Sequence, residues 1–237
     1  MKPAAVPALA LASALCAISP APALTYGTGT FTCPVTDKPF EAAVMMSGTR
    51  FGSYLDFRPF GPIASPDPLP VCPDASLFPL FKESFTPDEV AQIKRIVQTP
   101  EYKALIQARH QPYYVAAQVK ALLRYDPIEV AQDLLSASWQ AQPGSEQQQS
   151  YVREARARFA DAADARGQAP ELVRAARFLQ VELSRQLGEF DRAASLLNEW
   201  FPASSVPAQD PFAPRVAAER QALERRDAGP VLVGGRP

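Results

Sequence analysis

The sequence is poor in the side chains that carry most enzyme chemistry. Its 237 residues include one histidine, His110, and three cysteines, Cys16, Cys33 and Cys72. This supply excludes histidine-rich metal centres and an HExxH zinc site. It also leaves few groups for acid–base or nucleophilic catalysis, and no set of residues indicates a catalytic site. We therefore expect a protein that is not an enzyme and that needs no cofactor.

An excess of charge of one sign is also lacking. Lys and Arg total 24 against 25 Asp and Glu, which gives a net charge of -1. Proteins that bind nucleic acid by releasing counterions normally have a strong basic excess, so nucleic acid is not an expected partner. Glycine is sparse, with 11 residues against 25 prolines. Many of these prolines stand singly at segment junctions, where they mark the ends of structural elements rather than low-complexity chain.

The first 23 residues have the pattern of a secretory signal peptide. Lys2 precedes an apolar run over 6–18, and two alanines form an A-x-A cleavage pattern just before Leu24. The run is shorter than the roughly 20 residues that a membrane-spanning helix needs. Retention of the segment as an anchor and lipidation at Cys16 are the alternatives. We expect a periplasmic or secreted protein whose mature chain does not insert into a membrane.

Two regions of different composition follow this segment. Residues 24–85 carry Gly and Pro at short intervals between brief aromatic or β-branched runs, which is typical of short strands and turns. From Thr86 onward the chain has explicit helix start signals, and Asp126 and Ser145 begin similar motifs. These signals predict helices over 86–97, 99–109, 112–124, 127–140, 145–166, 170–187, 190–201 and 211–226.

The predicted organisation has five parts. They are a signal peptide (1–23), a small β/loop head (24–85), a helical repeat-like domain (86–201), a linker with a terminal helix (202–226) and a disordered tail (227–237). The tail is predicted to be disordered because only three apolar residues stand between Gly229-Pro230 and Gly234-Gly235, which are too few to hold the segment in place.

The helical region is predicted to form hairpins. Leucine and alanine recur at three- and four-residue spacing over 172–187, which draws an apolar stripe along one helix. The turn at 187–190, followed by Ala193 and Leu197, resembles the second half of a tetratricopeptide motif. We therefore expect a mainly α fold, with tetratricopeptide-like hairpins and a small N-terminal β/loop head.

Two short segments of the head are alike. They are Cys33-Pro34-Val35-Thr36 and Cys72-Pro73-Asp74-Ala75. Together with Phe40, Ser47-Gly48-Thr49, Leu55-Asp56, the run 68–73 and Thr86-Pro87-Asp88-Glu89, over residues 30 to 200, they resemble the bacterial domain of unknown function 2225 family. Members of that family often carry two CxxC pairs ahead of a tetratricopeptide-like region. Here Thr36 and Ala75 stand where the second cysteines would be, and two thiolates alone do not complete a tetrahedral zinc site.

The resemblance implies that Cys33 and Cys72 lie close together. In an oxidising compartment we expect this pair to form a disulfide that replaces a crosslinking metal. Two free buried thiols, or a metal site completed by Asp37, Asp74 or His110, are the alternatives. A redox catalyst is disfavoured because no CxxC remains to resolve a mixed disulfide.

The other candidate residues have structural interpretations. His110 stands at a predicted helix end, where its cation would interact well with the helix carbonyls. Asp56 is expected to orient a loop by pairing with Arg58 or Arg50. Residues 47–52 form a turn in this interpretation, since they lack the order and the lysine of a phosphate-binding loop.

Two functions are compatible with the sequence. The first is a non-catalytic interaction protein whose helical hairpins bind a protein or peptide partner while the head closes one end of the stack. The second is an enzyme or small-ligand-binding protein with a site between head and helices that uses Asp56, Arg50 or His110. The sequence favours the first, and it identifies neither the partner nor the oligomeric state.

Overall fold

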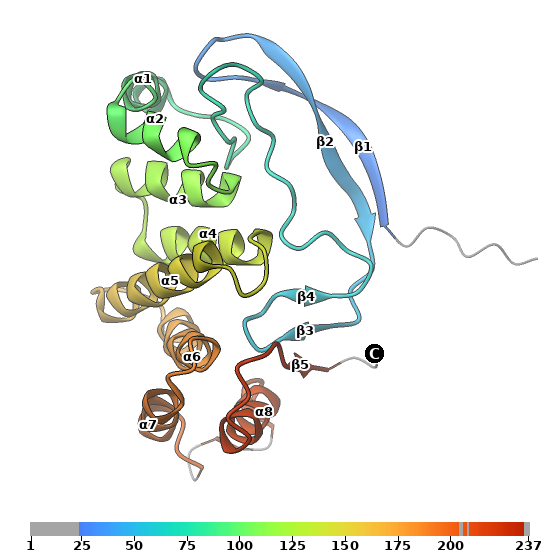
Figure 1. The fold of residues 1–237 in the computed structure, drawn as a ribbon, viewed down its shortest axis with the longest axis vertical. Coiled ribbons are helices and arrows are strands. Elements are labelled where there is room, and N and C mark those ends of the chain that lie inside the picture. The colour runs from blue at the N-terminus through green and yellow to red at the C-terminus, as the bar shows by residue number, and fades with distance from the viewer. Residues whose placement is uncertain (1–23, 204–205, 208, 235–237) are drawn as a thin grey trace, which may run out of the picture.

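A computed structural model describes residues 24–203, 206–207 and 209–234 (Figure 1). The predicted signal peptide lies outside these residues. The elements are β1 (Leu24–Thr32), β2 (Pro39–Gly48), β3 (Gly52–Tyr54), β4 (Pro59–Phe60), α1 (Pro87–Ile96), α2 (Pro100–Gln107), α3 (Pro112–Leu122), α4 (Pro127–Gln140), α5 (Glu146–Asp164), α6 (Pro170–Gln186), α7 (Phe190–Trp200), α8 (Ala213–Glu224) and β5 (Leu232–Val233).

The predicted helices are present, close to their predicted bounds. At the start of α1, Glu89 N donates to Thr86 Oγ1 (3.3 Å) while Thr86 N donates to the Glu89 carboxylate (2.7 Å), which closes a capping box. The side chains of Asp126 and Ser145 accept from the first turns of α4 and α5 in the same way. The mainly α fold is therefore confirmed.

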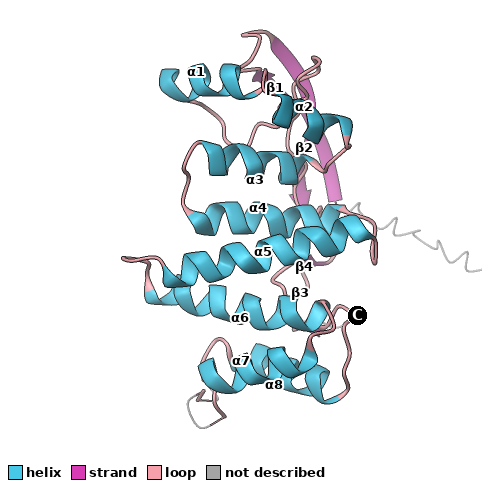
Figure 2. Ribbon diagram, turned by 60° about the vertical axis from the view of Figure 1, so that its left-hand side comes forward, coloured by secondary structure: helices cyan, strands magenta, loops and turns pink. Residues whose placement is uncertain are grey.

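Consecutive helices pack against each other in chain order from α3 to α7, and Figure 2 shows them as a stack. The central apolar cluster lies within this stack and includes Leu134, Tyr151, Phe159 and Leu183. Packing between neighbours does not by itself identify a repeat family, so the tetratricopeptide-like hairpins stay a prediction. None of the described helices has both the length and the apolar character that a bilayer crossing requires.

The head shares its core with the helices. Cys33, Cys72 and Phe78 of the head lie in one buried cluster with Ile93 of α1 and Val119 of α3. A further cluster joins the β3–β4 turn to α6, α7 and α8. The composition of the chain changes near residue 85, but the apolar core continues across that point.

The segment between β4 and α1 runs along one side of the helical stack (Figure 1). Tyr113 Oη donates to the carbonyl oxygen of Asp67 (2.9 Å), and Tyr102 Oη donates to the carbonyl oxygen of Ser76 (2.9 Å). Side chains of α2 and α3 thus bind main-chain carbonyls of an extended part of the same chain. This side of the stack is occupied by the head.

The tail is ordered as far as Gly234, contrary to the prediction of disorder, and its last residues lie outside the described part. β5 pairs antiparallel with β3, where Ser53 is opposite Val233, and Leu55 N donates to Val231 O (2.9 Å). Val231 and Val233 also pack against the cluster of α6, α7 and α8. Few apolar residues are enough here because the backbone of β3 offers a free strand edge.

Candidate binding site between the head and the helical stack

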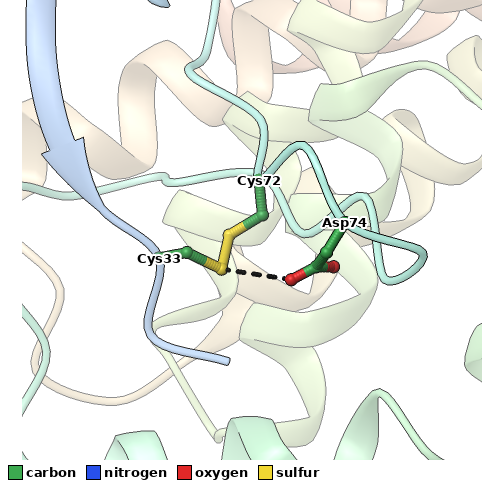
Figure 3. Close-up of side chains that lie close together, drawn as sticks. All are labelled: Cys33, Cys72 and Asp74. Atoms are coloured by element: carbon green, nitrogen blue, oxygen red, sulfur yellow. Dashed lines mark hydrogen bonds between the residues drawn. A yellow bond between two sulfur atoms is a disulfide. The ribbon is translucent and has the colours of Figure 1, made fainter. Parts of the chain in front are cut away.

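Cys33 and Cys72 lie at disulfide distance, as expected. Their Sγ atoms are 2.11 Å apart and their Cα atoms 5.5 Å apart. Both residues are buried, and Oδ2 of Asp74 lies 3.6 Å from Sγ of Cys33 (Figure 3). The pair joins the end of β1 to the segment that precedes α1.

The surroundings of this pair also bear on the alternative of a metal site completed by Asp37, Asp74 or His110. Of the three proposed additional ligands only Asp74 lies here, with the donor atoms of Cys33, Cys72 and Asp74 within 4.8 Å of one another. Asp37 forms an ion pair with Lys94 instead (2.7 Å). Bonded sulfur atoms are not thiolates, and three donors leave a tetrahedral site incomplete, so these residues do not fit a zinc ion in the oxidised protein.

His110 lies in an aromatic cluster and not at a ligand site. Its Nδ1 is 2.7 Å from Oη of Tyr151, and its ring stacks on Tyr114 with 4.3 Å between centroids. Burial lowers the pKa of the His110 imidazole, which favours the neutral ring. The ring thus contacts two tyrosines, and the lowered pKa disfavours the charged cap predicted for the preceding helix. The backbone N of His110, in contrast, donates to the carbonyl oxygen of Leu105 at the end of α2 (3.4 Å).

Asp56 pairs with Arg58, as predicted, but it binds the backbone of Arg58 and not its guanidinium. Oδ1 of Asp56 accepts from the backbone N of Arg58 (3.1 Å), while the Arg58 guanidinium lies 4.4 Å from the centre of the Tyr54 ring. Asp56 is only 5% exposed. Arg50 is exposed, and its Nε donates to the carbonyl oxygen of Gly52 (3.1 Å). The structure therefore does not bring Arg50 or His110 to Asp56.

Helices α4 and α6 supply the other partners of Asp56. Oδ2 of Asp56 accepts from Nε1 of Trp139 (2.9 Å) and from Nε2 of Gln186 (3.5 Å). The β3–β4 turn is thereby held between these two helices. A carboxylate with several donors is well stabilised at low exposure.

A cleft of about 300 Å³ lies beside this contact. Its walls come from the β3–β4 turn, the α4–α5 connection, the end of α6 and the C-terminal segment, and they include Asp56, Arg58, Trp139, Gln186 and Pro230. A second hollow of about 370 Å³, with Leu135 and Leu179 in its walls, borders Asp56 and Trp139 as well. The cleft combines charged and amide groups with an aromatic ring, as small-molecule sites do.

A buried cluster of charged side chains supports one wall of the cleft. Glu182 is 1% exposed, and Arg185 and Glu219 are fully buried. Arg185 donates from Nε (2.9 Å) and Nη2 (2.8 Å) to Glu182, and its Nε is 3.4 Å from Glu219. Nη1 of Arg185 donates to the carbonyl oxygens of Asp227 and Gly229. One guanidinium thus joins α6, α8 and the C-terminal segment.

Gln186 connects this cluster to the cleft. Its Nε2 donates to Oε1 of Glu182 (2.8 Å) as well as to Asp56. A continuous set of polar contacts therefore runs from Glu219 through Arg185 and Glu182 to Asp56. The charged cluster holds both the C-terminal wall and an amide that faces the cleft.

The two buried glutamates share one positive partner and keep a proton. Burial raises the pKa of Glu182, with Glu219 adding to the effect, and burial also raises the pKa of Glu219. Glu182 receives hydrogen bonds from Arg185 and Gln186, and Arg185 also forms an ion pair with Glu219 (3.4 Å). Because the two carboxyl groups interact, we assign the proton to the Glu182–Glu219 pair, which leaves one carboxylate for one guanidinium.

This proton makes folding stability depend on pH. The unfolded chain releases it near the ordinary value of 4.5, while the folded chain holds it to higher pH. The stability that this proton adds is therefore fully present below pH 4.5. It is lost as pH rises from 4.5 towards the raised pKa of the folded protein, and the free energy of unfolding falls by at most about 1.4 kcal/mol per pH unit. Urea denaturation between pH 4.5 and 8 measures this slope. Glu219→Gln leaves Arg185 with a single carboxylate and no shared proton, so it should flatten the slope. An unchanged slope would contradict a proton shared by the pair.

Trp139→Phe is expected to destabilise the protein by about 1–3 kcal/mol, because Asp56 loses a donor while it stays buried. Trp200→Phe is the matched control, since the indole of Trp200 donates to the exposed Glu199 (3.0 Å). Urea denaturation of both variants measures the difference. Equal effects would show that the Trp139 bond to Asp56 adds little stability.

Sequence reasoning placed Asp56 between head and helices but missed its partners. Trp139 and Gln186 lie far along the chain and carry no local signal that points to Asp56. No protein-family model, curated protein or solved structure matches this chain. The resemblance to the domain of unknown function 2225 family therefore stays a prediction.

Proposed function

We propose that this is an exported, non-catalytic binding protein that holds a small ligand in the cleft between head and helical stack. The convergence of four distant chain segments on this cleft carries the proposal. Asp56, Arg58 and Gln186 offer hydrogen-bonding groups, and Trp139 and Pro230 offer apolar surface. A small organic molecule with a polar and an apolar part matches these walls.

The occupied side of the stack favours this site over a groove for a foreign peptide. The chain's own segment already accepts hydrogen bonds from Tyr102 and Tyr113. The crosslink at Cys72 holds that segment beside the helices. A competing peptide would have to displace a covalently tethered chain, so the cleft is the more accessible place.

Native mass spectrometry of the protein, purified without denaturation from the compartment to which it is exported, tests the proposal. We expect a small bound mass on the wild-type chain. Ala228→Trp, at an exposed cleft position, should remove the bound mass by filling the space. Ala157→Trp, at an exposed position of α5 outside the cleft walls, should retain it.

Two results would overturn the proposal. One is a bound mass that persists equally in both tryptophan variants, since the ligand would then lie elsewhere. The other is a wild-type chain without bound small molecule that crosslinks to a stoichiometric protein partner, which would support binding through the helices instead.

A further inference from the structure

Strand β1 forms one edge of a sheet that has only two strands in the described part of the chain. β2 pairs with it from Leu24 opposite Gly48 to Thr32 opposite Pro39, with one shift in register between Thr25 and Tyr26. Figure 1 shows the N-terminal part of β1 on the outer side of this hairpin, away from the helices, while its C-terminal end runs towards them. Two-stranded sheets are marginal in water, and their edge peptide groups are open to another strand.

The two edges of this sheet differ in composition. β2 begins with Pro39 and carries Glu41, and proline and charge both oppose strand addition. β1 has the sequence LTYGTGTFT, which contains neither a charged residue nor a proline over its nine residues. The edge of β1 therefore lacks the features that protect most edge strands.

The exposed face of β1 presents a row of side chains suited to cross-strand pairing. Tyr26, Thr28, Thr30 and Thr32 are exposed, and they alternate with less exposed residues. Tyr26 is 52% exposed, and Met46, near it on β2, is 67% exposed. An aromatic residue opposite a β-branched one is a favourable pair between antiparallel strands.

We propose that β1 pairs antiparallel with β1 of a second copy of this chain, about a two-fold axis at Thr28. This register pairs all nine residues and keeps exposed side chains on one face. Tyr26 then lies opposite Thr30 of the partner subunit. The two-fold axis repeats this contact, so that Thr30 lies opposite Tyr26 of the partner subunit. The two hairpins become one four-stranded sheet.

A second copy fits this edge because the strand is nearly symmetric about its centre. Gly27 and Gly29 flank Thr28, and a threonine or an aromatic residue stands at each of the next two positions on either side. An isologous contact requires such self-complementarity. The absence of charge also means that identical edges do not repel each other. This inference is independent of the cleft and of what binds there.

Sedimentation equilibrium of the purified protein over a range of concentrations tests the pairing. We expect reversible dimers in the micromolar range, because edge pairing buries a small area. Thr28→Lys places two lysines directly opposite each other at the axis, with their Cβ atoms about 5 Å apart, and this like-charge pair should weaken the dimer about tenfold or more. Thr28 is exposed, so its replacement leaves the fold of the single chain unaffected.

Ala43→Lys is the matched control. Ala43 is exposed and lies directly opposite Thr28 on β2, but the proposed sheet separates its two copies by about 14 Å. We expect Ala43→Lys to dimerise nearly as the wild type does. Thr28→Cys should in addition form a covalent dimer on oxidation, since paired Cα atoms lie within disulfide range, whereas Ala43→Cys should not.

The proposal is wrong if the wild-type chain is monomeric at every concentration. It is also wrong if both lysine variants weaken association equally, because the contact would then lie elsewhere. A dimer that resists Thr28→Lys, without crosslinking through Thr28→Cys, would likewise exclude pairing along β1.

Discussion

Replacing Arg185 by methionine is expected to lower the free energy of unfolding by about 3–5 kcal/mol. The substitution leaves Glu182 and Glu219 buried without a cation. It also removes the donors to the carbonyl oxygens of Asp227 and Gly229, so the C-terminal wall of the cleft should loosen. Urea denaturation followed by circular dichroism measures the stability, and hydrogen exchange measures protection of the C-terminal segment.

Arg177→Met is the control, because Arg177 lies on the same helix with its side chain exposed. A loss in Arg185→Met no larger than in Arg177→Met would contradict the role of the buried cluster. Replacing Glu182, Arg185 and Glu219 together by methionine should restore much of the stability, since no charge is then left unpaired. Failure of this triple variant to recover would mean that the hydrogen bonds, rather than charge compensation, dominate.

Cys33→Ser should destabilise the protein by up to about 4 kcal/mol, because it opens a loop closed by residues 39 positions apart. Cys72→Ser and the double variant should match it, since each change opens the same loop. The cluster around the pair includes Ile93 and Val119, so α1 and α3 should lose stability together with the head. Thermal denaturation of the three variants measures the effect.

Wild-type protein unfolded under reducing conditions provides the control and should match the serine variants. A reduced wild type that keeps its full stability would show that the bond adds nothing. Mass spectrometry of the non-reduced protein should find two fewer hydrogens than the chain with free thiols. Two free thiols, or one zinc ion per chain, would contradict the disulfide and support the alternatives drawn from the sequence.

The helices could be predicted because their start signals are local. At Thr86 the capping residue, the proline after it and Glu89 lie within one turn, and all three act as predicted. The side chains of Asp126 and Ser145 likewise cap the N-termini of α4 and α5. Such signals need no information about the rest of the fold. The closeness of Cys33 and Cys72, in contrast, was implied only by a family resemblance.

Features that depend on distant contacts could not be predicted. Glu182 and Arg185 are three residues apart on a helix, a spacing usually found in solvated surface pairs, and only the packing of α8 and the C-terminal segment buries them. The order of the tail depends on its pairing with β3, a strand of the head that is distant in sequence. Burial lowers the pKa of His110, and the rings that pack on it, Tyr114 and Tyr151, come from helices α3 and α5.

The pairing of β3 with β5 has a consequence for the order of folding. β3 lies in the head and β5 in the C-terminal segment, so their small sheet cannot form until the last residues are available. Such non-local contacts slow folding. Because the N-terminal part of the chain is made first, the bond between Cys33 and Cys72 can form early. Arg185, in contrast, can bind Glu219 and Gly229 only after those later residues have been made. During synthesis, the region around α6 and α8 should therefore be the last to become resistant to proteases.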